Sequence, residues 1–220
     1  TEQESPINVL ENRQGIYPMS FSQKRLWFID KLQGQNAVFN LPATFRLQGQ
    51  IQLPLIQQAL QQLMQRHESI RTLFFEQGGE PVQYVLPQAE VPFVVNESLK
   101  GHAWDDDAVQ AVLREDAFKP FALEQDLKMR ALAIALGDDE SLLQITLHHI
   151  SADGMSMGIL VKEFNQIYTA LAQGEAASLP EPELQYLDFA QWQGEALDNK
   201  GLEPHINYWK NTLQGAPKCH

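Results

Sequence analysis

The chain has 220 residues, of which 44% are hydrophobic and 20% are charged, a balance typical of a folded globular protein rather than a disordered one. Its net charge of -12 argues against a nucleic-acid or anionic-membrane surface, because both need clustered lysine and arginine. One cysteine, Cys219, excludes an internal disulfide framework and suits a reducing compartment, so we expect a cytoplasmic location. No apolar run reaches the ~18 residues of a membrane-spanning helix.

Helical periodicity recurs along the whole chain. A capping box at Ser20 and Gln23 predicts the start of the first helix, and Pro54 suits the first turn of the second. A wide apolar stripe follows Gly154 and stops before Gly174, which predicts a helix that packs against a core. The predicted helices cover residues 20–32, 54–67, 105–118, 155–173, 186–197 and 206–213.

Strand patterns lie between these helices, and two pairs of them flank short turns that predict hairpins. The predicted strands cover residues 43–47, 72–75, 82–86, 129–136 and 142–149. Because hairpins alternate with helices, the order predicts an α/β or α+β fold with a mixed β-sheet covered by helices.

Two adjacent histidines, His148 and His149, end the last predicted strand, and Asp153 and Gly154 lie just before a helix. Neighbouring side chains of a strand point to opposite faces, so the two imidazoles diverge and His149 continues the face of Leu147 into the protein. The divergence argues against zinc, since no Cys or Glu completes a ligand set. Asp153 has a simpler explanation as a helix cap, and Gly154 as a tight-turn residue.

These residues and five other segments resemble the condensation domains of nonribosomal peptide synthetases. LHHISADGMS (147–156) fits the HHxxxDG motif of that family, and FALEQDLKMRALAI (121–134) is similar to its F-D-L-x-x-G-P-L-x-R-A segment. The remaining matches are MSFSQKRLWFI (19–29), RHESIRTLF (66–74), YLDFAQWQ (186–193) and YWKNTLQGAP (208–217). The resemblance implies that residues 1–220 form the N-terminal, chloramphenicol-acetyltransferase-like lobe of a two-lobed domain whose second lobe is absent from this chain.

The resemblance also implies an activity. The family joins two substrates, each held as a thioester on the phosphopantetheine arm of a carrier protein, when the acceptor α-amine attacks the donor thioester. The implied partners are an upstream donor carrier, a downstream acceptor carrier, the second lobe and a neighbouring adenylation domain. We expect no directly bound cofactor, no metal, no nucleic acid and no membrane. We also expect this half alone to be inactive, because the family's substrate tunnel runs between the two lobes.

Matching positions assign the catalytic role to His149. An α-amine has a pKa near ~8, so His149 acts either as a base or as a group that positions the amine, and the sequence leaves both open. The backbone N–H of Gly154, expected at a helix start, is a candidate for stabilising the oxyanion. His148 and Asp153 are implied to be structural, with Arg71 as the expected ion-pair partner of Asp153.

Alternatives of the same fold remain. An epimerisation domain shares the HHxxxDG motif, although the segments at 19–29 and 66–74 resemble condensation domains more closely. A stand-alone acyltransferase that uses a soluble acyl donor and a carrier-docking module with a decayed site are the other two. A heterocyclisation domain is excluded because that family has aspartates where this chain has His148 and His149.

Overall fold

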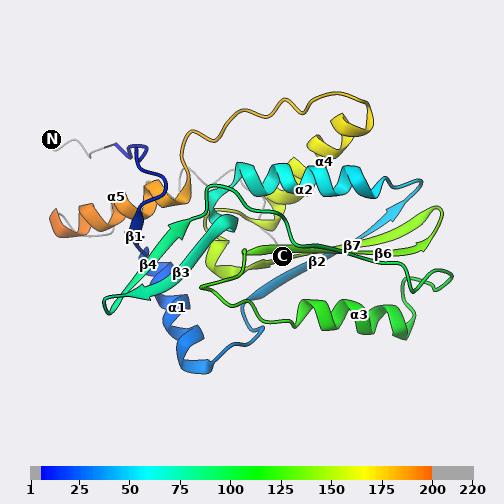
Figure 1. Ribbon diagram of the computed structural model, residues 1–220, viewed down its shortest axis with the longest axis horizontal. Helices are drawn as coiled ribbons and strands as arrows, with labels where there is room; N and C mark the ends of the chain where they lie inside the picture. The colour runs from blue at the N-terminus through cyan, green and yellow to red at the C-terminus, as the bar shows by residue number, and fades with distance from the viewer. Residues whose placement is uncertain (1–5, 200–220) are drawn as a thin grey trace.

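The computed structural model describes residues 6–199, which form two β-sheets surrounded by helices (Figure 1). The elements in chain order are β1 (Ile16–Pro18), α1 (Phe21–Gln33), β2 (Asn40–Gln48), α2 (Leu53–Arg66), η1 (Glu68–Arg71), β3 (Thr72–Gln77), β4 (Glu80–Val85), β5 (Phe93–Asn96), α3 (Asp107–Ala117), β6 (Met129–Gly137), β7 (Glu140–His148), η2 (His149–Ser151), α4 (Met157–Ala172) and α5 (Tyr186–Asn199), where η denotes a 3-10 turn.

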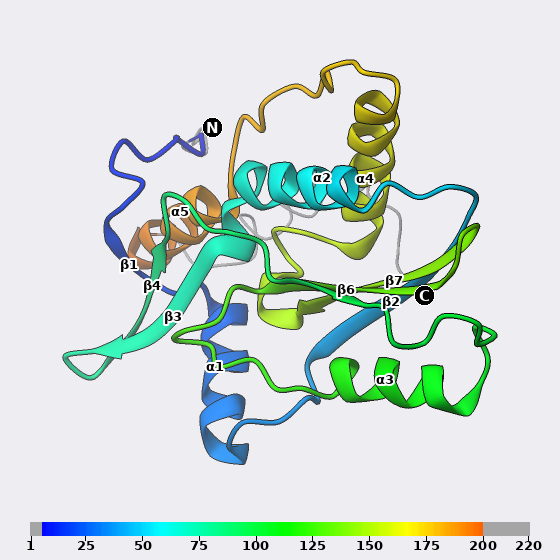
Figure 2. The same ribbon diagram turned by 45° about the vertical axis from the view of Figure 1, so that its right-hand side comes forward.

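The larger sheet has four strands in the order β2-β7-β6-β5. β5 and β6 run parallel and are connected through α3, whereas the other neighbouring strands are antiparallel. Helices α2 and α4 cover one face of this sheet and α3 covers the other (Figure 2). Because both faces are covered, β6 and β7 are buried along almost their whole length. The sequence of β6 is almost continuously apolar, whereas β7 also buries the polar residues Ser141, Gln144, Thr146 and His148.

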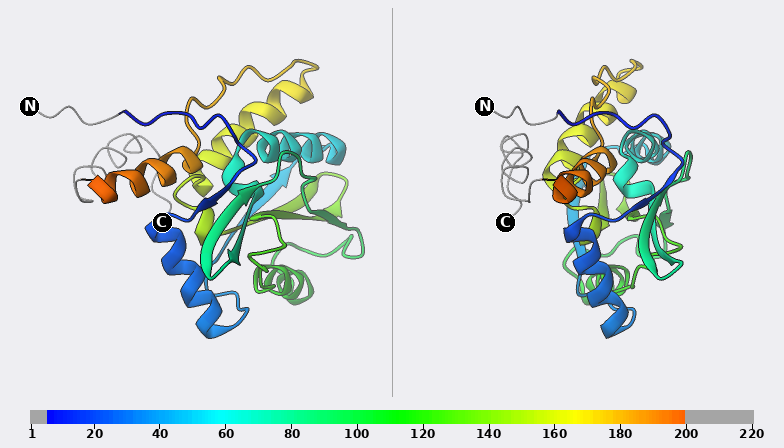
Figure 3. Two further views of the ribbon diagram at one scale, coloured as in Figure 1. Left: turned by 60° about the vertical axis from the view of Figure 1, so that its left-hand side comes forward. Right: turned by 90° about the vertical axis from the view of Figure 1, so that its left-hand side faces the viewer.

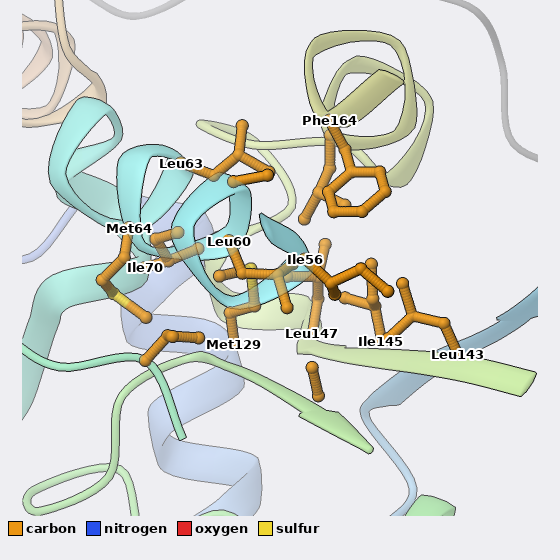
Figure 4. Close-up of a cluster of buried hydrophobic side chains, with 14 of the residues drawn as sticks. Ile56, Leu60, Leu63, Met64, Ile70, Met129, Leu143, Ile145, Leu147 and Phe164 are labelled. Carbon is orange, nitrogen blue, oxygen red and sulfur yellow. The ribbon is translucent and has the colours of Figure 1, made fainter. Parts of the chain in front are cut away.

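The main hydrophobic core lies between α2, α4 and the larger sheet (Figure 4). Leu60 and Met64 reach down from α2, while Leu143, Ile145 and Leu147 rise from alternate positions of β7. All five are at most 1% exposed. This packing holds β7 against two helices, so the residues that follow β7 start from a rigid support.

The smaller sheet has three antiparallel strands in the order β1-β4-β3. Helix α5 contacts β1 and η1, and α1 contacts η2, the turn that follows β7. Figure 3 shows α1 and α5 on the same side of the molecule, beside the end of the larger sheet. The chain thus brings α1, η1, η2 and α5 together where β7 ends.

The mixed-sheet architecture predicted from the sequence is confirmed, as are the predicted helices that fall within residues 6–199. The capping box is present, since Ser20 Oγ accepts the Gln23 N–H and the Gln23 side chain accepts the Ser20 N–H. The sequence did not predict β1 or β5, which are too short to show a clear alternation. The predicted helix at 206–213 lies outside the described residues. Within residues 6–199, no helix is both long enough and apolar enough to cross a membrane.

Candidate active site

The histidine pair lies at the junction of β7 and η2. The prediction that the strand continues through His149 is wrong by one residue, because β7 ends at His148. The His148 N–H donates to the Lys128 carbonyl at 3.2 Å, and the His149 N–H donates to the Phe39 carbonyl at 2.9 Å. Segments on both sides of β7 therefore hold the backbone of the two histidines.

The His148 ring is buried, with 1% of the residue exposed. Its Nδ1 accepts the Ile150 N–H at 3.0 Å, which places the proton of the neutral ring on Nε2 and closes the η2 turn. The Phe121 ring meets it edge-on at 5.6 Å. Burial, followed by the nearby charges of Lys128 and His149, lowers the pKa of His148 to about 3. A neutral ring that accepts a main-chain N–H fits the structural role expected for His148.

The His149 side chain is exposed. The expectation that it projects into the protein is wrong, because His149 lies in the η2 turn instead of the strand and its side chain is exposed. One ring is buried and the other is exposed, and it is His148 rather than His149 that lies inside the protein. His149 can therefore be reached by a substrate, whereas His148 cannot.

The predicted ion pair between Asp153 and Arg71 is not among the ion pairs of the described residues. Asp153 is exposed, and its Oδ2 accepts the Ser22 hydroxyl of α1 at 2.7 Å. The same hydroxyl lies 3.1 Å from the Tyr186 hydroxyl, which is 2.9 Å from Ser20 Oγ. Asp153 thus joins the turn after η2 to α1 and α5 through hydroxyl groups.

Arg71 is 5% exposed and uses its guanidinium on main-chain carbonyls. Its Nε donates to the Met64 carbonyl at 2.8 Å and its Nη2 to the Gln65 carbonyl at 2.9 Å. Its Nη1 donates to the carbonyl of Leu86. These acceptors occupy the guanidinium, so Arg71 fixes the end of α2 and the exit of β4 instead of pairing with Asp153.

The expectations for Gly154 also require correction. Helix α4 begins at Met157 with Ser156 as its N-cap, so neither Asp153 nor Gly154 stands at the helix start. The Gly154 N–H donates to the Ser151 carbonyl at 3.1 Å and is therefore already used, which argues against the expected oxyanion role. The glycine is instead required by packing, because an added Cβ would lie 2.8 Å from Tyr186 Cβ.

We predict that Gly154→Ala destabilises the protein by about 1–3 kcal/mol, the usual cost of forcing extra atoms into a packed site. The new methyl group would meet Tyr186 on one side and, at 2.9 Å, the Cβ of Ser69 on the other. Urea denaturation measures the change in the free energy of unfolding. Gly194→Ala is the matched control, since a Cβ at that helical position meets nothing within 4 Å. Equal stability of the two variants would contradict the packing role of Gly154.

Two buried ionic networks near the site were not predicted as such from the sequence. Arg13 pairs with both Glu68 of η1 and Asp188 of α5. Glu163 of α4 accepts from Arg66 Nε at 2.9 Å and lies 2.6 Å from His67 Nε2. Burial alone would raise the pKa of Glu163, but the hydrogen bonds and charges of His67 and Arg66 together keep it below its usual value.

Arg66 and His67 thus tie the end of α2 to α4 through Glu163. In the sequence, these ionic networks are indicated by charged residues that recur inside otherwise apolar segments. Within residues 6–199, no three His, Cys, Asp or Glu side chains gather as a metal site would require.

Comparison with known proteins agrees with this architecture. Residues 13–219 match the condensation domain family. The chain is 38% identical over 200 residues to one of the linear gramicidin synthase subunits of Brevibacillus parabrevis, covering 90% of this chain and 4% of that protein. It is also 38% identical over 204 residues to surfactin synthase subunit 2 of Bacillus subtilis (strain 168), covering 93% of this chain and 5% of that protein. The chain belongs to the condensation domain family.

Solved structures show the same fold. The X-domain of teicoplanin biosynthesis, in its complex with OxyB, superposes with a TM-score of 0.78 at 23% identity, covering 99% of this chain and 47% of that one. The first condensation domain of the calcium-dependent antibiotic synthetase superposes with a TM-score of 0.74 at 18% identity, covering 94% and 50%. The chain therefore spans about half the length of these structures and a few per cent of the synthetase subunits.

Proposed function

We propose that the domain containing this chain forms a peptide bond between two substrates, each carried as a thioester on a phosphopantetheine arm. The observation that carries the proposal is His149, an exposed imidazole at the end of a buried strand in a member of the condensation domain family. The fixed backbone around it supports a role in catalysis, because a reactive group works best on a rigid element.

In this reaction the acceptor α-amine attacks the donor carbonyl, the C–N bond forms, and the C–S bond to the donor arm breaks. The amine loses one proton as the bond forms, and the departing sulfur gains one. His149 can accept the first proton and return it to the sulfur, or it can hold the amine in line for attack. Both roles need only an accessible ring nitrogen, which the exposed side chain provides.

The surrounding residues support this assignment by holding the turn in place. His148 closes η2 through the Ile150 N–H, and the Ser151 hydroxyl donates to the Ser69 carbonyl at 2.9 Å. Asp153 ties the same turn to α1. We assign these residues to positioning and His149 alone to contact with the reacting atoms.

The proposal includes the partners of the reaction. They are a donor carrier, an acceptor carrier, a second lobe and a neighbouring adenylation domain, in a cytoplasmic protein that binds no cofactor directly. The size of the relatives supports this part of the proposal. The chain matches only 4–5% of the gramicidin and surfactin synthase subunits, so those proteins contain many further residues. The phosphopantetheine arms belong to the carriers and would bring the substrates to His149.

The direct test supplies the complete two-lobed domain with a loaded donor carrier and a loaded acceptor carrier, and follows the acceptor by mass spectrometry. The proposal expects a donor–acceptor product attached to the acceptor arm. Inversion of the donor α-carbon without transfer would indicate epimerisation instead. Transfer only from a soluble acyl donor would indicate a different acyltransferase.

We predict that the 220-residue chain alone forms no product under the same conditions, since the proposed catalytic cleft would need a wall from the second lobe. The comparison uses equal concentrations of the chain and of the complete domain, with circular dichroism as the control for folding. Formation of the peptide-bond product by the folded chain alone, above the level of a reaction without protein, would overturn this prediction.

A further inference from the structure

A hollow of about 400 Å³ opens beside α3, on the face of the larger sheet that lies opposite α2 and α4 (Figure 2). A volume of this size is typical of sites that bind small molecules. The hollow reaches Leu142 near the start of β7, whereas the histidine pair lies at the end of that strand. The stretch from Leu142 to His148 covers about 20 Å, so the hollow lies away from the proposed catalytic site.

The larger sheet forms the floor of the hollow. Thr44 and Arg46 of β2 stand directly opposite Gln144 and Leu142 of β7, and residues paired in this way share one face of a sheet. Leu142 and Gln144 are buried, whereas Thr44 and Arg46 are exposed. Helix α3 therefore covers β7 but leaves the edge strand β2 open, and the hollow lies at this uncovered edge.

The polar atoms of the floor already have partners inside the protein. The Gln144 Oε1 accepts the Thr44 hydroxyl at 2.8 Å, and its amide nitrogen donates to the Leu113 carbonyl at 2.9 Å and to Asp116 Oδ2 at 2.7 Å. The remaining floor is the apolar surface of Leu113 and Leu142. A ligand with an apolar body can therefore lie on the floor without leaving a buried polar group unpaired.

The rim of the hollow carries an aromatic ring and a guanidinium that are both held in place. Trp104 is 42% exposed, and the guanidinium carbon of Arg46 lies 5.5 Å from the centre of its ring. Gln110 donates to the Trp104 carbonyl at 2.9 Å, and Arg46 Nε donates to Glu140 at 2.9 Å. Among the described residues, no hydrogen bond occupies the indole N–H of Trp104 or the terminal nitrogens of Arg46.

The charge of the hollow favours an anion. The described residues that line it include two arginines, Arg46 and Arg114, and no carboxylate. Glu140 balances the charge of Arg46. Arg114 is exposed on α3 and has no ion-pair partner within residues 6–199. One positive charge is thus left over, and a ligand with one negative charge would neutralise it.

We propose that this hollow is a binding site for a small aromatic carboxylate, separate from the site at His149. The carboxylate would accept from the Arg114 guanidinium, whose planar donors match a carboxylate in geometry and charge. The aromatic body would pack against the Trp104 ring and over Leu113 and Leu142, where it loses contact with water. Binding should need neither a carrier protein nor a phosphopantetheine arm.

The test titrates the isotope-labelled complete domain with phenylacetate and follows the Trp104 indole and Gln144 side-chain amide signals by NMR. We expect both signals to shift and to saturate together, since one group lies on the rim and the other in the floor. Phenylacetamide has the same ring without the charge and should bind about tenfold more weakly, or weaker still. Arg114→Gln, at an exposed helical position, should fold and should weaken phenylacetate binding by about tenfold or more.

Two control variants show where the probe binds. Arg25→Gln removes an exposed arginine of α1, and it should bind phenylacetate like the wild type. His149→Ala should also bind like the wild type, and loss of binding in that variant would place the probe at His149 and overturn the inference. Equal affinities for phenylacetate and phenylacetamide would overturn it as well, as would a failure of either signal to saturate. Should Arg114→Gln not fold, the comparison of these two probes on the wild-type domain decides. Tighter binding of phenyl phosphate, which carries more negative charge, would contradict a site built for one charge.

Discussion

His149→Ala in the complete domain is expected to lower kcat for peptide-bond formation by about 10²–10⁴-fold, the usual contribution of proton transfer by a positioned side chain. The ring is exposed, and the contacts that hold η2 come from the His149 backbone and from His148. Removing the His149 side chain should therefore leave the turn intact. The measurement is single-turnover product formation between loaded carriers, with the free energy of unfolding determined in parallel.

His102→Ala serves as the control for this experiment. His102 is another exposed histidine, 3.2 Å from Asp106 in the loop before α3 and on a different part of the fold. Its variant should keep wild-type activity and stability. An unchanged rate for His149→Ala would contradict the assignment of His149 as the catalytic residue. A large loss of stability in this variant would show that the ring holds the turn instead of acting on substrate.

Asp188→Ala is expected to lower the free energy of unfolding by about 3–5 kcal/mol, the range found when one partner of a buried ion pair is removed. The Asp188 side chain is 1% exposed and pairs with Arg13. It also accepts the Leu10 N–H at 2.8 Å and the Gln185 N–H at 2.9 Å. The alanine variant would leave a partly buried guanidinium and two main-chain donors without this acceptor.

Urea denaturation with matched m-values measures that loss. Asp105→Ala removes an exposed carboxylate and should change the stability little. A cost below about 1 kcal/mol for Asp188→Ala would mean that the pair behaves as a solvent-screened surface ion pair. That result would contradict its role as the tie between the N-terminal segment and α5.

The architecture was predictable because most elements carry strong local signals. The Ser20 capping box, the proline at the start of α2 and the apolar stripe of α4 each point to one structure. The apolar alternation of β7 likewise predicted the strand that leads to the two histidines. These are properties of short stretches of chain.

What the sequence could not reveal depends on contacts between distant segments. The pairing of Asp153 with Arg71 was mistaken because a sequence gives no sign that carbonyls, rather than carboxylates, accept from a buried guanidinium. The orientation of His149 was mistaken because β7 ends one residue earlier than its apolar pattern indicates. The burial of Lys128, which has no exposed surface, could not be predicted because its position in an apolar run does not show whether the charge is buried.

The bond from the Leu10 N–H to Asp188 closes a loop of 178 residues. Closing a long stretch of chain is entropically costly, so this contact is expected to form late in folding, after the local hairpin of β6 and β7. During folding, the turn that carries His149 therefore acquires its strand support before α5 docks against the N-terminal segment. In the native protein, amide hydrogens of α5 should exchange through local opening, whereas those of β7 should exchange only when the whole fold opens.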